Sequence, residues 1–195
     1  MSGIAPIVWP TDRMTLRRLE ASDADEFVRM VEVSREHWTP WTPARPVGSS
    51  DRDHFDQELD RTTMGVETGN HLRLVALLDG VRLAGMFSLN EIVRGVFQSA
   101  YAGWAVSADL TGQGLGTEGV RALIDIAFTP EPDGLGLHRV QANIMPGNAG
   151  SIRIAEKIGF RREGVAARYL RIAFSWEDHV MFALTREERD RTNGS

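Results

Sequence analysis

The sequence predicts an α+β fold in which a mixed, largely antiparallel sheet with a central parallel pair is flanked by helices. Three observations support this prediction. The first half contains a hairpin signal, with Asp79-Gly80 between two apolar runs, and the second half alternates strand-like with helix-like segments. Between the halves, a strand-like run ends at a glycine-rich turn, 112–117, that leads into a helix. This crossover would make the strands that contain residues 106 and 140 parallel neighbours.

Apolar periodicity and capping residues define the elements of the first half. Residues 14–19 form a first strand, and Ser22 with Asp25 three residues later predicts a capped helix that ends at about residue 36. The prolines and tryptophans of 37–46 exclude a continuous helix and predict an ordered loop. A second helix over 51–62 follows Ser50, and the Asp-Gly turn joins strands over 72–78 and 81–89.

The second half begins with a strand over 99–106, which leads through the glycine turn to a helix over 120–128. A strand over 138–145 comes next, then a helix over 148–158 that Gly159 closes. The last strands cover 165–172 and 176–184. The polar residues 186–195 predict a frayed tail, so we expect one domain over 1–188 and a tail over 189–195.

Composition excludes several classes of function. The formal net charge of −5 argues against generic nucleic-acid binding. The absence of cysteine excludes disulfides, thiolate metal sites and a cysteine nucleophile. The N-terminus lacks a basic region before an apolar stretch, and no window is apolar enough to span a bilayer. We therefore expect a cytoplasmic protein with no nucleic-acid partner and no membrane partner.

The glycine turn is the strongest candidate for a binding site. Gly112, Gly114 and Gly116 remove side chains where a backbone must approach a ligand, and the free amides of a first helical turn attract anions. Glycines also precede helices in ordinary tight turns, so these residues alone leave phosphate binding and a structural turn equally open. The turn lacks the Gly-Lys-Ser/Thr ending of a nucleotide-binding P-loop.

Several segments together resemble the GNAT acetyltransferases, and more narrowly the RimJ/RimL branch, whose founding members acetylate the N-termini of ribosomal proteins. They are the strand and turn over 104–118, the strand His138-Arg-Val-Gln-Ala-Asn-Ile and the run over 148–164. The likeness extends from Arg13-Met-Thr-Leu-Arg-Arg-Leu to Trp176-Glu-Asp-His-Val-Met-Phe-Ala-Leu, so it spans nearly the whole chain.

The resemblance implies acyl transfer from acetyl-CoA to an amine, without a metal or a covalent intermediate. Another acyl-CoA, such as succinyl-CoA, stays open as the donor. The acceptor would be a protein N-terminus or a small amine, and the net acidity of the chain mildly favours a cationic one. Family members often pair as homodimers through the late strands, and this chain permits the same pairing.

The resemblance also implies a set of cofactor contacts. Splayed parallel strands would expose backbone groups of Trp104, Ala105 and Val106 to the pantetheine arm, and the Val106 amide would stabilise the thioester oxygen. The family's turn begins with Arg or Gln where this chain has Thr111, so we expect weakened CoA binding, with Gln113 and Thr117 as replacement polar contacts. The other predicted contacts are Gly112, Gly114, Leu115, Gly116, Asn143, Asn148 and Ser151.

The catalytic residues are less well defined by the same likeness. Ser151 matches a serine proposed to protonate the departing thiolate, although it could equally be a surface hydroxyl beside a capping Asn148. RimL-like enzymes are thought to use a glutamate where this chain has Arg168. The general base therefore stays open between Glu91, His37 and an amine that arrives neutral.

The role of two tryptophans and the overall function each have an open alternative. Trp38 and Trp41 either line an acceptor pocket or only anchor the loop between the first two helices. The runner-up function is a catalytically weak CoA-binding sensor or interaction module of the same fold. Thr111 and the missing glutamate motivate that alternative.

Overall fold

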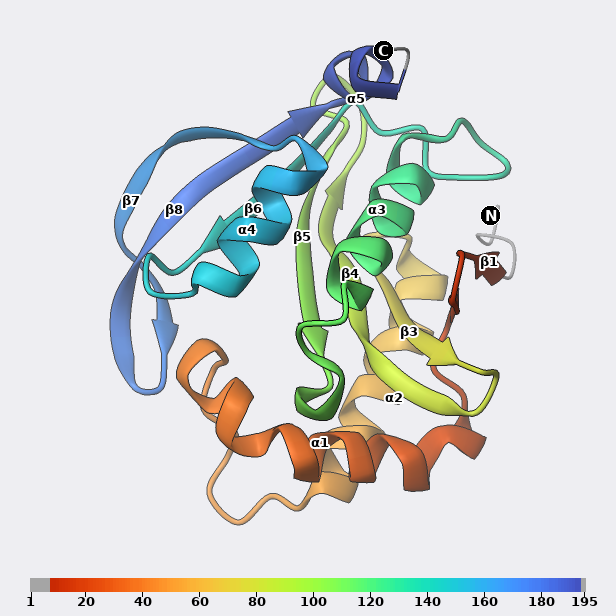
Figure 1. Cartoon of the computed structure of the whole chain (residues 1–195), viewed down its shortest axis with the longest axis vertical. Helices are drawn as coiled ribbons and strands as arrows, with labels where there is room; N and C mark the ends of the chain where they lie inside the picture. The colour runs from red at the N-terminus through yellow and green to blue at the C-terminus, as the bar shows by residue number, and fades with distance from the viewer. Residues whose placement is uncertain (1–7, 194–195) are drawn as a thin grey trace.

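The protein is built on a twisted sheet of 8 strands in the order β1-β2-β3-β4-β5-β6-β8-β7 (Figure 1). This is a computed structural model, and it describes residues 8–193. All neighbouring strands are antiparallel except β5 and β6, which are parallel as predicted. The strands are β1 (Val8–Pro10), β2 (Met14–Arg17), β3 (Leu72–Leu78), β4 (Arg82–Val93), β5 (Ser99–Val106), β6 (Arg139–Ile144), β7 (Arg161–Ile172) and β8 (Ser175–Thr185).

Helices cover both faces of this sheet. Figure 1 shows α3 and α4 in front of the strands and α2 behind them. Each face has its own apolar cluster, one including Val120 and Leu123 of α3 and the other including Phe27 of α1 and Phe55 of α2. The helices are α1 (Ala24–Trp38), α2 (Asp51–Thr68), α3 (Leu115–Phe128), α4 (Ala149–Ile158) and α5 (Arg186–Asn193). Within 8–193, no helix combines the length and the apolar character needed to cross a membrane.

The parallel pair separates part of the way along the sheet. Its last paired residues are Tyr101 and Gln141, whereas β5 continues to Val106 and β6 to Ile144. Figure 1 shows the two strands diverging toward the ends that lead into α3 and α4. The sheet therefore opens at the carboxyl ends of its parallel strands, which is where ligands bind in such sheets.

The structure extends or shifts several predicted elements. Residue 38 ends α1, and the helix is preceded by a short turn in which the Glu20 amide donates to Asp23 Oδ2 at 2.8 Å. The predicted Ser22–Asp25 cap is therefore wrong by two residues. Helix α2 begins after Ser50 as predicted, with the Asp53 amide donating to Ser50 Oγ at 3.0 Å, but it continues to Thr68.

Helix α3 begins at Leu115, five residues before the predicted start. Gly116 and Gly119 have low helix propensity, so the sequence pattern hides its first turn. Strand β1 carries too few residues to produce a pattern, and the predictions omitted it.

The predicted frayed tail over 186–195 is wrong for the described residues, because Arg186–Asn193 form α5. This helix has no apolar stripe that would identify it in the sequence. It is fixed by Arg189, which is 8% exposed and donates from Nη2 to Asp125 Oδ1 of α3 at 2.6 Å. The helix also runs across the predicted domain boundary at residue 188. Residues 1–7 and 194–195, which belong to the predicted domain and tail, lie outside the described part of the chain.

Candidate functional site

A cleft of about 850 Å³ lies where β5 and β6 diverge. Its walls come from β5, the 111–114 turn, the first turns of α3 and α4, and the last turn of α1. The structure places every predicted cofactor contact along this cleft except Gln113. His37, Trp38 and Trp41, predicted from the loop region, line it as well.

The glycine turn presents backbone amides to the cleft. Gly114 precedes α3 with φ of 83°, a left-handed conformation that glycine adopts without strain. It provides no capping side chain, so the first-turn amides of Leu115, Gly116 and Thr117 keep free donors. Free amides at a helix N-terminus, aligned with the helix dipole, are groups that can bind phosphate anions.

Gly116 is required by a close approach of three elements. A Cβ atom at this position would lie 2.8 Å from Ile154 Cδ1 of α4 and 3.1 Å from Val106 Cγ2 of β5. A methyl group here would force the Ile154 and Val106 side chains to repack against α3. Gly116 therefore permits the close packing of these side chains beside the cleft.

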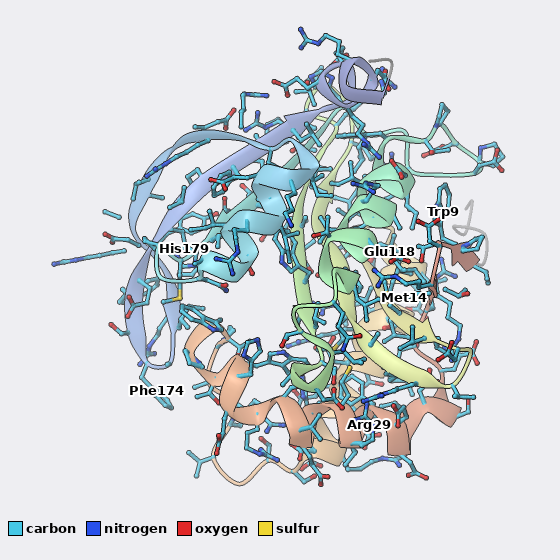
Figure 2. All side chains as sticks on the ribbon, viewed as in Figure 1. Trp9, Met14, Arg29, Glu118, Phe174 and His179 are labelled. Carbon is cyan, nitrogen blue, oxygen red and sulfur yellow. The ribbon has the colours of Figure 1, made fainter. Side chains whose placement is uncertain are left out.

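A polar network behind the turn holds it in place. Glu118 of α3 accepts hydrogen bonds from Thr11 Oγ1 at 2.6 Å and from the Arg13 amide at 2.8 Å. The Arg13 guanidinium pairs with Glu118 and also donates to the Gln113 carbonyl at 2.9 Å. In Figure 2, Glu118 lies beside Met14 at the start of β2.

This network changes the expected role of Gln113 and the pKa of Glu118. Gln113 does not line the cleft, and its carbonyl is used by Arg13 instead. Burial acts to raise the pKa of Glu118, but the hydrogen bonds from Thr11 and Arg13 outweigh it and hold the pKa below its ordinary value. Glu118 therefore stays ionised at neutral pH and holds the turn against the segment that precedes β2.

Thr111 leaves the turn without a cation at its first position. Its hydroxyl lies in the cleft wall but donates to the Ala108 carbonyl at 3.0 Å. Two cations that the sequence analysis missed, Arg153 and Lys157, line the cleft from α4, and no Asp or Glu among the described residues does so. Their i, i+4 spacing on one exposed helix face is the signal that could have identified them.

The backbone of β5 offers unpaired groups to the same cleft. The Ser107 amide donates to the Ala84 carbonyl at 2.9 Å, and the register with β4 is regular from Gly85 to Asn90. Because hydrogen bonding alternates along a strand, the backbone groups of Trp104 and Val106 point away from β4, toward the gap left by β6. The Val106 carbonyl accepts from Trp38 Nε1 at 2.9 Å, which leaves the Val106 amide available.

Two buried polar atoms in this region have no partner among the described residues. They are Asn143 Oδ1 and Trp104 Nε1, and both residues line the cleft. Asn143 is oriented by its amide nitrogen, which donates to the Tyr169 hydroxyl at 3.0 Å. A ligand with amide groups, such as a pantetheine arm, would satisfy an orphaned acceptor of this kind.

Helix α4 brings Asn148 and Ser151 to the cleft. Asn148 caps the helix, because its Oδ1 accepts from the Ser151 amide at 3.1 Å. The capping role predicted for Asn148 is thus present, and the residue faces the cleft at the same time. His179 of β8, which the sequence analysis missed, also lines the cleft and is 3% exposed; it is labelled in Figure 2.

The structure separates the two predicted base candidates. His37 lies exposed on the last turn of α1 and lines the cleft. Glu91 is exposed at an irregularity of β4, with φ of 49°, and does not line the cleft. The charge of Glu91 contributes to a raised pKa of Tyr169, after burial and the nearby Tyr101 phenol. Arg168, at the family's glutamate position, donates its amide to Asp178 at 2.8 Å.

A second pocket of about 480 Å³ lies on the α1 and α2 side of the sheet. It shares part of its lining with the cleft, namely Trp38, Thr42, Gly103, Trp104 and Ala105. The two spaces therefore meet at the same stretch of β5. Trp38, 9% exposed, lies at the junction, whereas Trp41 lines only the cleft.

Residues 13–161 match the family described as the acetyltransferase (GNAT) domain. The chain is 33% identical over 173 residues to "Probable N-acetyltransferase YjcK" of Bacillus subtilis, covering 87% of this chain and 92% of that protein. It is 28% identical over 190 residues to the ribosomal protein uS5-alanine N-acetyltransferase of Escherichia coli, covering 94% and 93%.

Among solved structures, RimJ of Mycobacterium smegmatis in complex with CoA-disulfide has a TM-score of 0.87 and 26% sequence identity. The match covers 100% of this chain and 98% of that one. The sheet order, the diverging parallel pair and the glycine turn agree with these findings. The chain belongs to the GNAT acetyltransferase family, whose enzymes use acetyl-CoA as co-substrate, and its relatives include the RimJ/RimL ribosomal-protein acetyltransferases.

Proposed function

We propose that this acetyltransferase moves the acetyl group of acetyl-CoA to the N-terminal amine of a protein, by direct attack in a ternary complex. The observation that carries the proposal is the meeting of the cleft and the second pocket at Gly103, Trp104 and Ala105. A thioester held against β5 from one side would face an amine that enters from the other. Two substrates held at one junction need no covalent enzyme intermediate.

The chemistry of the cleft supports binding of the donor on this side. The amides of 115–117 would hold the diphosphate, and Arg153 and Lys157 would add the positive charge that Thr111 does not supply. The backbone groups of Trp104, together with Asn143 Oδ1, would pair with the amides of the pantetheine arm. This arrangement would direct the thioester toward the Val106 amide.

The reaction would then proceed in one displacement. The amine nitrogen attacks the thioester carbonyl carbon, and the Val106 amide stabilises the negative charge that develops on the carbonyl oxygen. The carbon–sulfur bond breaks, the thiolate leaves, and Ser151 would protonate it. The attacking nitrogen loses its extra proton to water or to His37, because Glu91 lies outside both spaces.

The protein N-terminus is favoured over a small amine by the relatives, among which is the ribosomal protein uS5-alanine N-acetyltransferase. A pocket of about 480 Å³ also has room for several residues of an extended chain. The alternative of a catalytically weak CoA-binding sensor is not favoured, because relatives that match most of this chain are named N-acetyltransferases.

A panel of acceptors tests the proposal. Short peptides with a free N-terminus, the same peptides with a blocked N-terminus, and a polyamine are each incubated with acetyl-CoA. Release of CoA thiol and the site of acetylation are followed by DTNB and mass spectrometry. We expect acceptor-dependent thiol release and acetylation at the α-amine. Acetylation of the polyamine or of lysine side chains alone would contradict the proposed function. CoA binding without acetylation of any acceptor would instead favour the CoA-binding sensor.

A further inference from the structure

The second pocket has a local charge opposite in sign to that of the whole chain. Its lining includes four arginines, from α1, the 42–50 loop, α2 and β3, namely Arg35, Arg45, Arg61 and Arg73. Glu58 is the only carboxylate that lines it among the described residues. The chain as a whole carries −5, so this pocket is an exception that net charge could not reveal.

The carboxylates that pair with these arginines are shielded, whereas the arginines remain accessible. Asp51 accepts from Arg35 at 2.5 Å and from Arg45 at 2.8 Å, and Glu58 accepts from the other two arginines at 2.8 and 2.7 Å. Both acidic side chains are 10% exposed, against 26 to 53% for the arginines. The four positive charges are therefore met by only two negative ones, and the surplus is on the exposed side.

Two residues that line the pocket have buried nitrogens without a partner among the described residues. They are Arg73 Nε, which is a donor, and His54 Nδ1. Burial lowers the pKa of His54, so its imidazole is neutral and can present an N–H at one nitrogen. A carboxylate oxygen is the group that would satisfy such donors.

The register of the sheet relates these donors to the site of transfer. Arg73 pairs with Ser88 on β4, and Ser88 pairs with Gly103 on β5, so the three residues form a row on one face. Two strand spacings separate Arg73 from Gly103, about 10 Å. An extended chain advances about 3.3 Å per residue. A polypeptide whose amine is at Gly103 would therefore bring its second or third residue to the arginines.

We propose that this pocket selects acceptor N-termini that carry a carboxylate side chain at the second or third residue. The proposal rests on the proposed function, because it requires that the α-amine of a polypeptide enters through this pocket. It replaces the cationic acceptor expected from the net charge of the chain. A cationic acceptor would be repelled by Arg45 and Arg61. Their partner carboxylates, Asp51 and Glu58, are already engaged in ion pairs and could not offset this repulsion.

Matched peptides test the proposal on the intact protein. Three peptides share the first residue and the rest of the sequence but carry glutamate, glutamine or lysine at the second position, and a second set varies the third position. The kcat/KM of α-amine acetylation is measured for each. We expect the glutamate peptide to exceed the glutamine peptide by about fivefold or more at low salt, and the lysine peptide to be the poorest. The preference should shrink as salt increases.

Two variants test whether the arginines are the cause. Arg45→Gln leaves Asp51 paired with Arg35, and Arg61→Gln leaves Glu58 paired with Arg73. Neither variant therefore leaves a buried carboxylate without a cationic partner. We expect each to lower kcat/KM severalfold more for the glutamate peptide than for the glutamine peptide, so that the ratio between the two falls. The matched control is Arg121→Gln, an exposed residue of α3 that lines neither space.

The outcomes separate this proposal from the one on which it rests. Failure to acetylate any peptide at its α-amine would overturn the proposed function. Acetylation of the glutamine peptide as efficiently as the glutamate peptide would overturn only the selection. Equal losses for both peptides in the variants, or the same change in Arg121→Gln, would also overturn the selection, because the preference would not come from the pocket. The selection would also be overturned if free glutamate were acetylated more efficiently than the glutamate peptide.

Discussion

The indole Nε1 of Trp38, at the end of α1, donates a hydrogen bond of 2.9 Å to the carbonyl oxygen of Val106, at the end of β5. This bond joins the helix that bounds the second pocket to the strand that lines the cleft. The Val106 carbonyl is therefore occupied, and the amide is the backbone group of this residue that could bind a ligand. Trp38 thus has a defined structural partner, beyond its predicted place in a pocket wall.

Trp38→Phe removes this bond and keeps most of the ring. We expect kcat to fall about fivefold to tenfold, because a lost hydrogen bond of about 1 kcal/mol lets the end of β5 shift away from the thioester. Steady-state kinetics with a fixed peptide acceptor measure the effect. Trp176→Phe, at a side chain that is 61% exposed, is the matched control and should leave kcat unchanged. Equal activity of Trp38→Phe and the wild type would contradict the prediction.

Gly116→Ala tests the close packing beside the cleft. The added methyl group would lie 2.8 Å from Ile154 Cδ1 and 3.1 Å from Val106 Cγ2, so both side chains must repack beside the cleft. We expect the Kd for CoA in calorimetry to rise about threefold to tenfold. Ile154→Val removes that Cδ1 atom, and the double variant should recover part of the affinity. No recovery, together with a normal melting temperature, would show that the methyl group acts in another way.

Glu118→Gln tests the network behind the turn. Glu118 has a lowered pKa in the folded state, so its contribution to stability is complete above the ordinary glutamate pKa and is lost as pH falls through the lowered value. The substitution should reduce the free energy of unfolding at neutral pH by about 1–3 kcal/mol, because Thr11 and Arg13 lose a charged acceptor.

Urea titrations of the wild type and Glu118→Gln at neutral and acid pH provide the measurement. The stability difference between the two proteins should become smaller as the solution is acidified. Asp56→Asn, at a carboxylate that is 55% exposed, is the control and should change stability little at either pH. A difference that is independent of pH would refute the assignment to this carboxylate.

Asn143→Leu tests the orphaned acceptor in the cleft. If Asn143 Oδ1 accepts from the pantetheine arm, the KM for acetyl-CoA should rise about threefold to tenfold while the KM for the peptide stays constant. Because Asn143 also donates to Tyr169, Tyr169→Phe is made in parallel to isolate that second bond. A similar rise in both variants would assign the effect to the Tyr169 contact instead.

Ser151→Ala tests the acid that was inferred from the family likeness. A thiolate is a tolerable leaving group near neutral pH, so we expect kcat to fall by less than about tenfold. A loss of about a hundredfold or more, with a shift in the alkaline limb of the pH profile, would give Ser151 a larger role than proposed.

Most elements, in their order along the chain, and the end of the sheet where the cleft lies can be predicted from the sequence alone. The Asp-Gly hairpin, the 99–106 strand and the cap at Asn148 all carry local signals, because turn and capping chemistry depends on residues close together in the chain. The glycine turn, placed after a strand and before a helix, predicted the cleft for the same reason. The family likeness added the cofactor and the reaction.

Which side chains face one another depends on how the chain folds in three dimensions. Arg13 reaches Glu118 and Gln113 across about a hundred residues of sequence, and α5 is held by the buried Arg189 rather than by an apolar stripe. The arginines of the second pocket come from four separate segments, while the chain as a whole is acidic. Local pattern determines secondary structure through near neighbours, but charge in a pocket depends on contacts between distant segments, which no local pattern records.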